Sequence, residues 1–462
     1  MTGAPGGELV VCADLGSTWT KALLVDVTTG RLVATASHPT TLGKEGDDVL
    51  DGLDACVATL AVDHPGAATA EVRACSSAGG GLRIAVVGNE ELVTAEAGRR
   101  VALSSGGKVV AVAARGGAGG DQEPPPLGPL LADARPDLVL LTGGTDGGDT
   151  GVLVQAAHDL AASGWRGPVV VAGNADAAAE ASGALGDLPH STAPNVVPRI
   201  GVLAPEGARA AIREAFLAHV IGGKGLSARA DLTTLVRGAT PDVVLTGVEV
   251  LAAHVHATRG GDLAVVDVGG ATTDVYSATR VDPEQDGLAG EVVAPTGLTR
   301  TVEGDLGMRW SAPSTVATAG LDDLLDAAAA RALDPAWLPA DETDGDVDEA
   351  IARAAATHAL RRHAGRARVV LGPDGRVVER TGTDLREVVL VVGSGGVLRH
   401  GPAGVADRVL GAATTDPDDE GWQLPERADV VVDTAYLLVA LGLLADDHAG
   451  AARTLAGVLA PT

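Results

Sequence analysis

The chain has 462 residues, a length that predicts two or three domains rather than one. Its 34 Lys and Arg residues against 61 Asp and Glu residues give a formal net charge of −27, and a surface that acidic repels nucleic acid and anionic membranes. The three cysteines are scattered and form no CxxC pattern, which argues against a disulfide framework or a structural zinc site and indicates a reducing compartment.

Neither a signal peptide nor a membrane span is visible in the sequence. Residues 1–9 have no basic stretch followed by an apolar one, and long apolar runs such as residues 435–445 fall short of the ~20 residues that cross a bilayer. We therefore expect a cytoplasmic protein that binds neither membrane nor nucleic acid.

The first part of the chain predicts three strands and a helix. Residues 9–13 form a buried strand, and residues 22–27 and 32–37 form two more after the loop at 14–21. Residues 47–61 carry apolar side chains at helical spacing. Three antiparallel strands followed by a helix is the opening of a ribonuclease-H-like lobe.

Strand–helix alternation continues beyond this opening and predicts an inserted α/β subdomain around residues 82–200. A second strand–loop–strand unit begins at residue 263, and its loop covers residues 267–274. We expect an α/β fold of two ribonuclease-H-like, actin-like ATPase lobes, residues 1–245 and 246–462, the second ending in a helical segment. The acidic stretch at 340–349 predicts an exposed loop.

The loops of the two strand–loop–strand units are near-duplicates. They read D-L-G-S-T-W-T-K from residue 14 and D-V-G-G-A-T-T-D from residue 267. Glycine two residues after the aspartate removes the Cβ and lets backbone N–H groups approach an anion, and the hydroxyls add donors. Asp14 and Asp267 can each hold hydrated Mg²⁺, a hard cation that retains its waters.

Facing each other, two such hairpins would clamp a triphosphate. A later apolar strand, 388–392, ends in Gly393-Ser394-Gly395-Gly396 and would lie against adenine and ribose. The sequence therefore predicts ATP and Mg²⁺ as cofactors, held between the two lobes. No GxxxxGK[ST] string is present, so this is not a P-loop protein.

The order DLGSTWTK, VDVGGATTDV and VVGSGGV resembles the phosphate-1, phosphate-2 and adenosine motifs of the acetate kinase/sugar kinase/Hsp70/actin superfamily. Three further strings, CSSAGGGL, TGGTDGG and TVEGDLGMR, resemble the GlmL or MutL family, the accessory protein of adenosylcobalamin-dependent glutamate (methylaspartate) mutase. This resemblance runs over nearly the whole chain. It implies an ATP-driven reactivating protein, or chaperone, that partners the mutase subunits. The chain has no DxHxxG string, so any contact with cobalamin is expected through that partner.

By motif, the resemblance assigns water-mediated Mg²⁺ binding to Asp14 and Asp267, and makes Asp267 the leading catalytic base. It assigns phosphate contacts to the small residues and the lysine of the two loops: Gly16, Ser17, Thr18, Thr20, Lys21, Gly269, Gly270 and Thr272. It places Gly393, Ser394, Gly395 and Gly396 beside the nucleoside. Trp19 departs from the family pattern, in which a hydroxyl or Tyr is frequent at that position.

Several roles stay open at the level of sequence. Glu249, in a helix-like run before the second loop, is a candidate catalytic carboxylate that positions water, as in Hsp70-like proteins, although an exposed helix glutamate is the more common role. Glu303 and Asp305 either sense the γ-phosphate or form a helix-capping turn. His254 and His256 have no third metal ligand in range, which favours a surface or packing role over metal binding.

Two other functions are compatible with the same loops. A small-molecule kinase would need a defined acceptor pocket with a base, and a nucleotide-dependent scaffold would bind ATP without turnover. An iron–sulfur ATPase activator of the 2-hydroxyacyl-CoA dehydratase type is disfavoured, because the cysteines lie in no cluster motif. A homodimer is compatible with the sequence but not required by it.

Overall fold

The computed structural model describes residues 7–42, 46–89, 94–115, 126–280, 297–372, 375–414 and 421–461. The contacts divide the chain into two compact units: unit 1 extends to Leu245 and unit 2 begins at Thr246.

The first sheet of unit 1 has the strand order β10–β4–β1–β2–β3. Its strands are β1 (Leu9–Leu15), β2 (Trp19–Asp26), β3 (Arg31–Pro39), β4 (Glu71–Ser76) and β10 (Val236–Ala239). The first three are antiparallel neighbours, whereas β4 runs parallel to β1 and β10 parallel to β4. This is the ribonuclease-H-like arrangement, and its central strand β1 is buried almost throughout.

The helix predicted at 47–61 is α1 (Val49–Asp63), which packs Leu53, Cys56 and Leu60 into the core of this sheet. The Asp48 carboxylate starts the helix by accepting a hydrogen bond from the Leu50 N–H at 2.9 Å. The other helices of unit 1 near this sheet are short: η1 (Pro65–Thr69), η2 (Ala78–Gly80) and α7 (Leu232–Leu235).

A second sheet is inserted between β4 and β10, and all five of its strands are parallel, in the order β6–β5–β7–β8–β9. They are β5 (Leu82–Gly88), β6 (Gly107–Ala114), β7 (Leu138–Leu141), β8 (Val169–Val171) and β9 (His190–Thr192). The helices between its strands and after the last of them are α2 (Glu96–Ser104), α3 (Leu127–Ala134), α4 (Gly151–Ala162), η4 (Ala175–Ala177), α5 (Ala178–Leu185), α6 (Glu206–Ala215) and η5 (Phe216–Val220).

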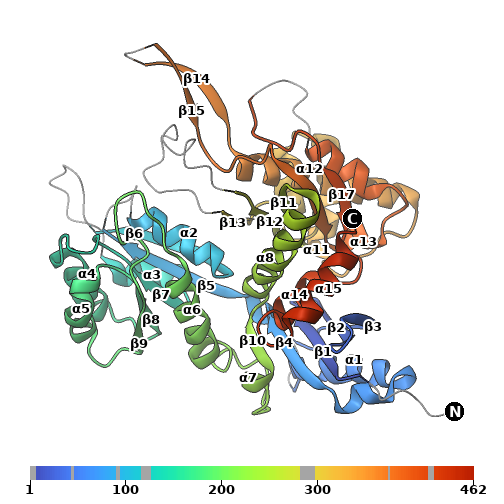
Figure 1. Cartoon of the computed structure of the whole chain (residues 1–462), viewed down its shortest axis with the longest axis horizontal. Coiled ribbons are helices and arrows are strands. Elements are labelled where there is room, and N and C mark those ends of the chain that lie inside the picture. Colours follow the sequence, from blue (N-terminus) through green and yellow to red (C-terminus); the bar gives the residue numbers. More distant parts are fainter. Residues whose placement is uncertain are drawn as a thin grey trace. The chain divides into compact units, whose positions relative to one another are not determined.

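Alternate side chains of the inserted strands face opposite layers. Helices α3, α4 and α5 share a core with one set, including Val87 and Leu141, while α2 and α6 pack against the other set, including Ile84 and Leu140. Figure 1 shows these helices around β5 and β7. The predicted strand–helix alternation in this region is confirmed.

Unit 2 repeats the topology of the first sheet, with the order β13–β12–β11–β16–β17. Its strands are β11 (Asp262–Val268), β12 (Thr273–Ala278), β13 (Leu298–Glu303), β16 (Val388–Ser394) and β17 (Asp429–Val432). Again the first three are antiparallel and the last two are parallel to the central strand. The predicted α/β fold with two ribonuclease-H-like sheets is confirmed.

One prediction for unit 2 was wrong. Residues 340–349 do not form an acidic loop, because α12 (Glu342–Ala364) begins there. The Asp341 side chain accepts a hydrogen bond from the Asp344 N–H at 3.0 Å, and carboxylates in the first turn are favourable beside the positive end of the helix dipole.

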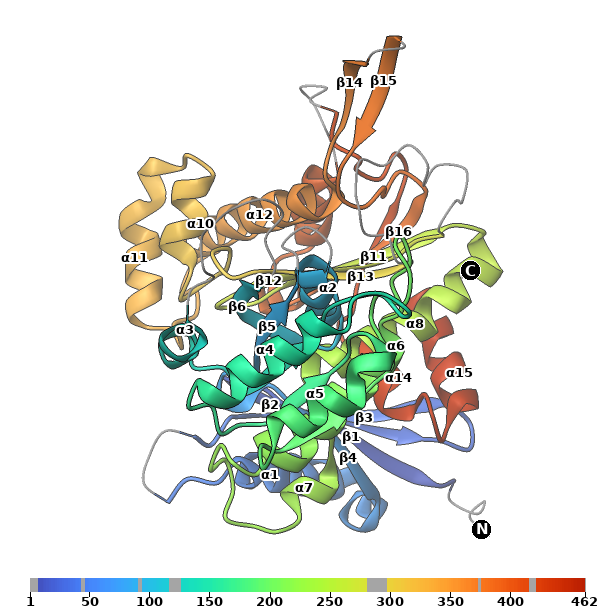
Figure 2. The ribbon, with the colours of Figure 1, turned by 90° about the vertical axis from the view of Figure 1, so that its left-hand side faces the viewer.

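The remaining elements of unit 2 are helical apart from one hairpin. The helices are α8 (Thr240–Arg259), which contains the boundary with unit 1, α10 (Ala312–Thr318), η6 (Asp322–Leu324), α11 (Leu325–Leu333), α13 (Gly396–His400), η7 (Asp407–Gly411), α14 (Leu437–Leu444) and α15 (Ala449–Leu459). The hairpin pairs β14 (Ala367–Gly372) with β15 (Gly375–Arg380) and follows the end of α12 (Figure 2). Within the described ranges, no helix is both long enough and apolar enough to cross a membrane.

Candidate functional site

The aspartate of the first loop lies at the end of the central strand of unit 1. Asp14 pairs with Lys21 across the β1–β2 hairpin, so both side chains share one face. The Lys21 Nζ lies 3.2 Å from Asp14 Oδ2, and Asp14 is only 5% exposed.

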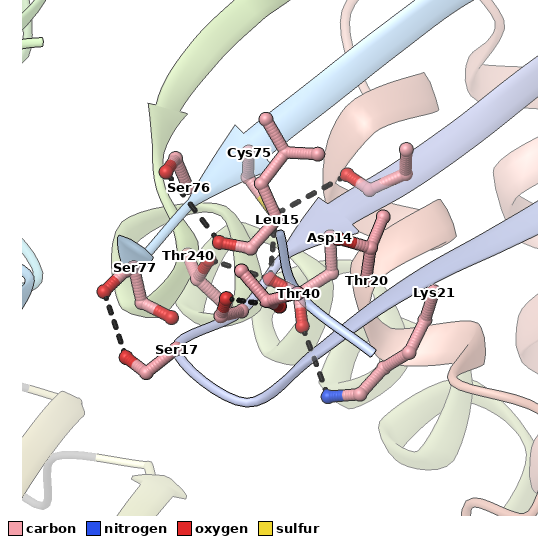
Figure 3. A network of polar contacts seen from close by, with 12 residues as sticks. Asp14, Leu15, Ser17, Thr20, Lys21, Thr40, Cys75, Ser76, Ser77 and Thr240 are labelled. Atoms are coloured by element: carbon pink, nitrogen blue, oxygen red, sulfur yellow. Dashed lines mark hydrogen bonds and ion pairs between the residues drawn. The ribbon is translucent and has the colours of Figure 1, made fainter. Parts of the chain in front are cut away.

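Two other elements contribute contacts to the Asp14 carboxylate, as Figure 3 shows. The hydroxyl of Thr240, the first residue of α8, donates to Asp14 Oδ1 at 2.7 Å. The Cys75 thiol at the end of β4 lies 3.7 Å from the same oxygen. Burial, together with the charge of Asp14, raises the pKa of the Cys75 thiol well above its usual range, so this cysteine stays protonated.

The loop that follows Asp14 is fixed from two sides. Gly16 accepts a hydrogen bond from the Thr40 hydroxyl at 2.8 Å, and the Ser17 hydroxyl donates to the Ser77 carbonyl at 3.0 Å. A Cβ on Gly16 would lie 2.6 Å from the Trp19 carbonyl oxygen, so the tight turn requires glycine there. The tip, residues 17–19, is exposed.

The second loop has the same register in unit 2. Asp267 pairs with Asp274 as Asp14 pairs with Lys21, and a Cβ on Gly269 would lie 2.8 Å from the Thr272 carbonyl oxygen. The Gly269 N–H donates to that carbonyl at 2.9 Å. The duplication seen in the sequence is therefore a duplication of strand register and of turn geometry.

The position opposite the aspartate holds a lysine in the first loop and a second aspartate, Asp274, in the second loop. Asp274 is 3.3 Å from the buried guanidinium of Arg300 on β13. Burial raises the pKa of Asp274 to about 6; Arg300 opposes this shift, and the negative charges of Asp267 and Glu303 add to it. Asp267 and Asp274 thus form a partly buried pair of like charges.

The late glycine motif lies at the same edge of this sheet. Ser394 of β16 is the register partner of Asp267 of β11. Gly395 has φ +115°, and a Cβ there would overlap the Val268 carbonyl oxygen, so the backbone after β16 packs directly on the end of β11. Unit 2 therefore brings Asp267, its loop and residues 393–396 together.

The donor chemistry of the two loops fits Mg²⁺. This ion keeps several waters and takes only one or two carboxylates together with phosphate oxygens. Asp14 and Asp267 each present a carboxylate at a strand end, and a cation would offset the charge repulsion between Asp267 and Asp274. Among the described residues, no group of three or more His, Cys, Asp or Glu side chains is placed to hold a metal ion by itself.

The family is decided by comparison with known proteins. The family model described as MutL protein matches residues 10–458. The curated Protein MutL of Clostridium tetanomorphum is 34% identical over 450 residues, which is 94% of this chain and 95% of that protein. The chain belongs to the MutL protein family. The resemblance found in its motifs is thereby confirmed.

Solved structures add distant likenesses to this MutL-family chain. A nucleotide-free acetone carboxylase structure aligns over 95% of this chain and 70% of its own, with 16% identity and a TM-score of 0.42. Component A of (R)-2-hydroxyglutaryl-CoA dehydratase from Acidaminococcus fermentans aligns over 96% of this chain and 100% of its own, with 10% identity and a TM-score of 0.30.

Some of the predicted site residues of this MutL-family chain do not lie beside the Asp14 or Asp267 carboxylate. Thr20 alternates with Lys21, so its side chain points to the other face of the hairpin, where Oγ1 lies against Gly52 of α1. Thr18 and Ser17 are on the exposed tip, and Thr272 lies in the turn of the second loop. Glu249 is on an exposed face of α8, and its catalytic role stays a prediction.

The family-specific string after β13 has a structural role that sequence left open. Arg362 of α12 pairs with Glu303 at 2.7 Å and with Asp305 at 2.8 Å. These carboxylates therefore tie the end of β13 to α12 and do not form a helix cap. Sensing of the γ-phosphate by Glu303 and Asp305, the other alternative, stays a prediction.

Sequence reasoning missed three residues beside the site. Thr240 touches Asp14 from a helix far along the chain, Arg300 offsets the charge of Asp274, and Asp433 follows β17. The Asp433 N–H donates to the Gly393 carbonyl at 2.9 Å, and its carboxylate accepts from the N–H groups of Leu437 and Leu438 at the start of α14. An Asp four residues before an apolar helix was the available signal for this last residue.

Proposed function

We propose that this chain binds ATP with Mg²⁺ through its two Asp hairpins, hydrolyses it slowly, and serves in the cytoplasm as a reactivating protein for an adenosylcobalamin-dependent mutase of the glutamate mutase type. The duplicated hairpin is the observation that carries the proposal. Two loops with the same aspartate position, the same obligatory glycine and the same register are hard to explain as separate tight turns.

Each hairpin would bind phosphate in the same way. Gly16 and Gly269 permit the tight turns of the two loops, whose backbone N–H groups would bind the phosphate oxygens, and Lys21 would add a positive charge in unit 1. Mg²⁺, when bound, supplies charge neutralisation for the phosphates, and Asp14 and Asp267 would hold it through its waters. Each unit would then be one ATPase lobe.

In hydrolysis, Asp267 would orient the attacking water and accept its proton. Its position at the end of β11, directly before the loop of residues 269–272, supports this role. Glu249 is the second candidate for positioning water. Residues 393–396, which adjoin Asp267 in the sheet, would border the nucleoside. The link to the mutase is supported by membership in the MutL protein family.

The proposal is tested by measuring ATP binding by calorimetry and phosphate release, with and without a cognate cobalamin-dependent mutase. The variants are Asp14→Ala and Asp267→Ala, and Asp63→Ala on the exposed end of α1 is the matched control for loss of a carboxylate. We expect the first two to lower turnover at least about a hundredfold, as loss of a positioned electrostatic group does, and the control to behave like the wild type.

The possible outcomes separate the candidate functions. Hydrolysis that rises with the mutase and is lost in both variants supports the reactivating role. ATP binding without turnover in either setting would leave a nucleotide-dependent scaffold, and transfer of phosphate to a small acceptor would indicate a kinase. Failure of the wild-type protein to bind Mg-ATP would overturn the proposal altogether.

A further inference from the structure

A short loop after β13, residues 304–311, braces the second phosphate loop within unit 2. The Met308 N–H donates to the Gly269 carbonyl at 2.9 Å and the Arg309 N–H to the Gly270 carbonyl at 2.7 Å. The Ser311 hydroxyl donates to the Ala271 carbonyl at 2.7 Å. We call residues 304–311 the bracing loop, since three successive carbonyls of the phosphate loop are held by it.

The side chain of Arg309 reaches from the bracing loop to the helices that follow. Its Nη2 lies 3.0 Å from Asp348 Oδ2 on α12, and its Nε donates to the Trp337 carbonyl at 3.3 Å. Arg331 of α11 reaches the other carboxylate oxygen, with Nε 2.6 Å from Asp348 Oδ1. One residue thus contacts the phosphate loop with its backbone and the helical layer with its guanidinium.

These side chains form a compact cluster. Asp348 is 4% exposed and Arg331 is 3% exposed, and both guanidinium groups lie over the Trp337 ring, at 5.6 Å for Arg309 and 4.2 Å for Arg331. A buried carboxylate shared by two arginines cannot lose one partner cheaply, because the remaining charges would be left without compensation. The side chains of the cluster should therefore move together when the bracing loop moves.

We infer that Arg309 is a positioning residue that makes α11 and α12 respond to occupancy of the second phosphate loop. The inference rests on the proposed function, because it takes the anion at residues 269–272 to be a nucleotide phosphate. An anion that reorients the Gly269–Gly270 peptide also shifts the carbonyls that hold Met308 and Arg309. Because the Arg309 side chain contacts Asp348 and Trp337, it moves them as well. Binding of the nucleotide therefore changes the position of the first turns of α12.

The first test uses the free protein and needs no nucleotide. Amide hydrogen exchange is followed at residues 267–272 and 304–311 in the wild type, Arg309→Gln and Arg408→Gln. Arg408 of η7 pairs with Glu349 of α12, the residue next to Asp348, at 2.7 Å. It is the matched control because this ion pair does not involve the bracing loop. We expect exchange in both segments to rise about tenfold or more in Arg309→Gln and to stay unchanged in Arg408→Gln. Unchanged exchange in Arg309→Gln would overturn the coupling.

The second test asks whether nucleotide uses this connection. The difference in fluorescence between the wild type and Trp337→Phe is the emission of Trp337, which depends on the two arginines stacked on its ring. With saturating Mg-ATP, we expect this signal to change and exchange at residues 342–349 to slow in the wild type and in Arg408→Gln. In Arg309→Gln both responses should disappear although ATP still saturates, and Arg309→Lys should restore part of them, because it keeps the charge but loses the forked pairing.

The two proposals fail in different ways. If calorimetry shows no Mg-ATP binding by the wild type, the proposed function fails, whatever the exchange of the free protein shows. If Mg-ATP binds and Arg309→Gln keeps the full Trp337 and α12 responses, the role of Arg309 is overturned while the nucleotide site stands. Should Arg309→Gln not fold, Arg309→Lys gives the same comparison through α12 exchange, because it keeps the charge but loses the forked pairing with Asp348, and a full response in it would equally overturn the role of Arg309.

Discussion

His363 is a buried histidine held between α12 and the sheet of unit 2. Its Nε2 lies 2.8 Å from the Ser277 hydroxyl of β12 and its Nδ1 lies 3.0 Å from the Thr301 hydroxyl of β13. Burial lowers the pKa of His363 to about 4. The ring is therefore neutral at physiological pH, and the two hydroxyls orient it on the side of the sheet that α12 covers.

This shift makes the stability of the protein depend on pH in a defined range. The unfolded chain binds a proton at a pKa of about 6.5, but folded His363 does so only near pH 4. The shift contributes nothing at pH 7, and the free energy of unfolding falls as pH drops from 6.5 to 4, by about 2 kcal/mol at pH 5. We expect His363→Gln to lose less stability between pH 7 and pH 5 than the wild type, in urea unfolding followed by circular dichroism. The exposed His219→Gln is the control, and equal losses in all three proteins would contradict the assignment.

At the scale of elements, two helical glycines differ in what surrounds them: one lies at a close contact between helices and the other faces open space. A Cβ on Gly247 of α8 would overlap the carbonyl oxygen of Leu438 in α14, whereas nothing lies within 4 Å of a Cβ on Gly345 of α12. We expect Gly247→Ala to lower the free energy of unfolding by about 2 kcal/mol, because the helices must separate. Gly345→Ala should raise it by about 0.5–1 kcal/mol through helix propensity. Thermal melts of the pair measure both, and stabilisation by Gly247→Ala would show that the two helices can move apart without cost.

Elements with a local physical signature could be predicted from the sequence. The strand–loop–strand units were found because the turns need glycine, and the strands are continuous apolar runs. The start of α12 could not be predicted in this way, because an acidic stretch is also typical of a solvated loop. In the structure, Asp341 caps the helix and the carboxylates suit its first turn. Contacts across the chain gave no such signal. Thr240 and Asp14 are 226 positions apart, and only the sheet brings them together.

The whole molecule carries far more negative than positive charge. The formal net charge of −27 implies self-repulsion in the folded state, which salt screens over about 10 Å at 0.1 M. Most ion pairs among the described residues involve a partly exposed partner, and such pairs contribute little to stability. Screening of repulsion should therefore outweigh screening of attraction.

We expect the melting temperature to rise when NaCl is increased from 10 to 300 mM. The rise should be roughly 2–4 °C, which is what about 1 kcal/mol produces in units of this size. Differential scanning fluorimetry with NaCl, and with an uncharged solute at equal osmolality, measures this effect. A melting temperature that falls with salt would show that the ion pairs dominate.

The insertion between β4 and β10 has a consequence for the order of folding. These neighbouring strands are separated by roughly 160 residues, and closing an unstructured loop of that length costs about 4 kcal/mol in chain entropy. The parallel sheet of β5–β9 forms entirely within that stretch. Once it has folded, little free chain is left between the two strands, and β10 can dock at a much lower entropic cost. The first sheet of unit 1 is thus expected to close last, after the subdomain that interrupts it in sequence.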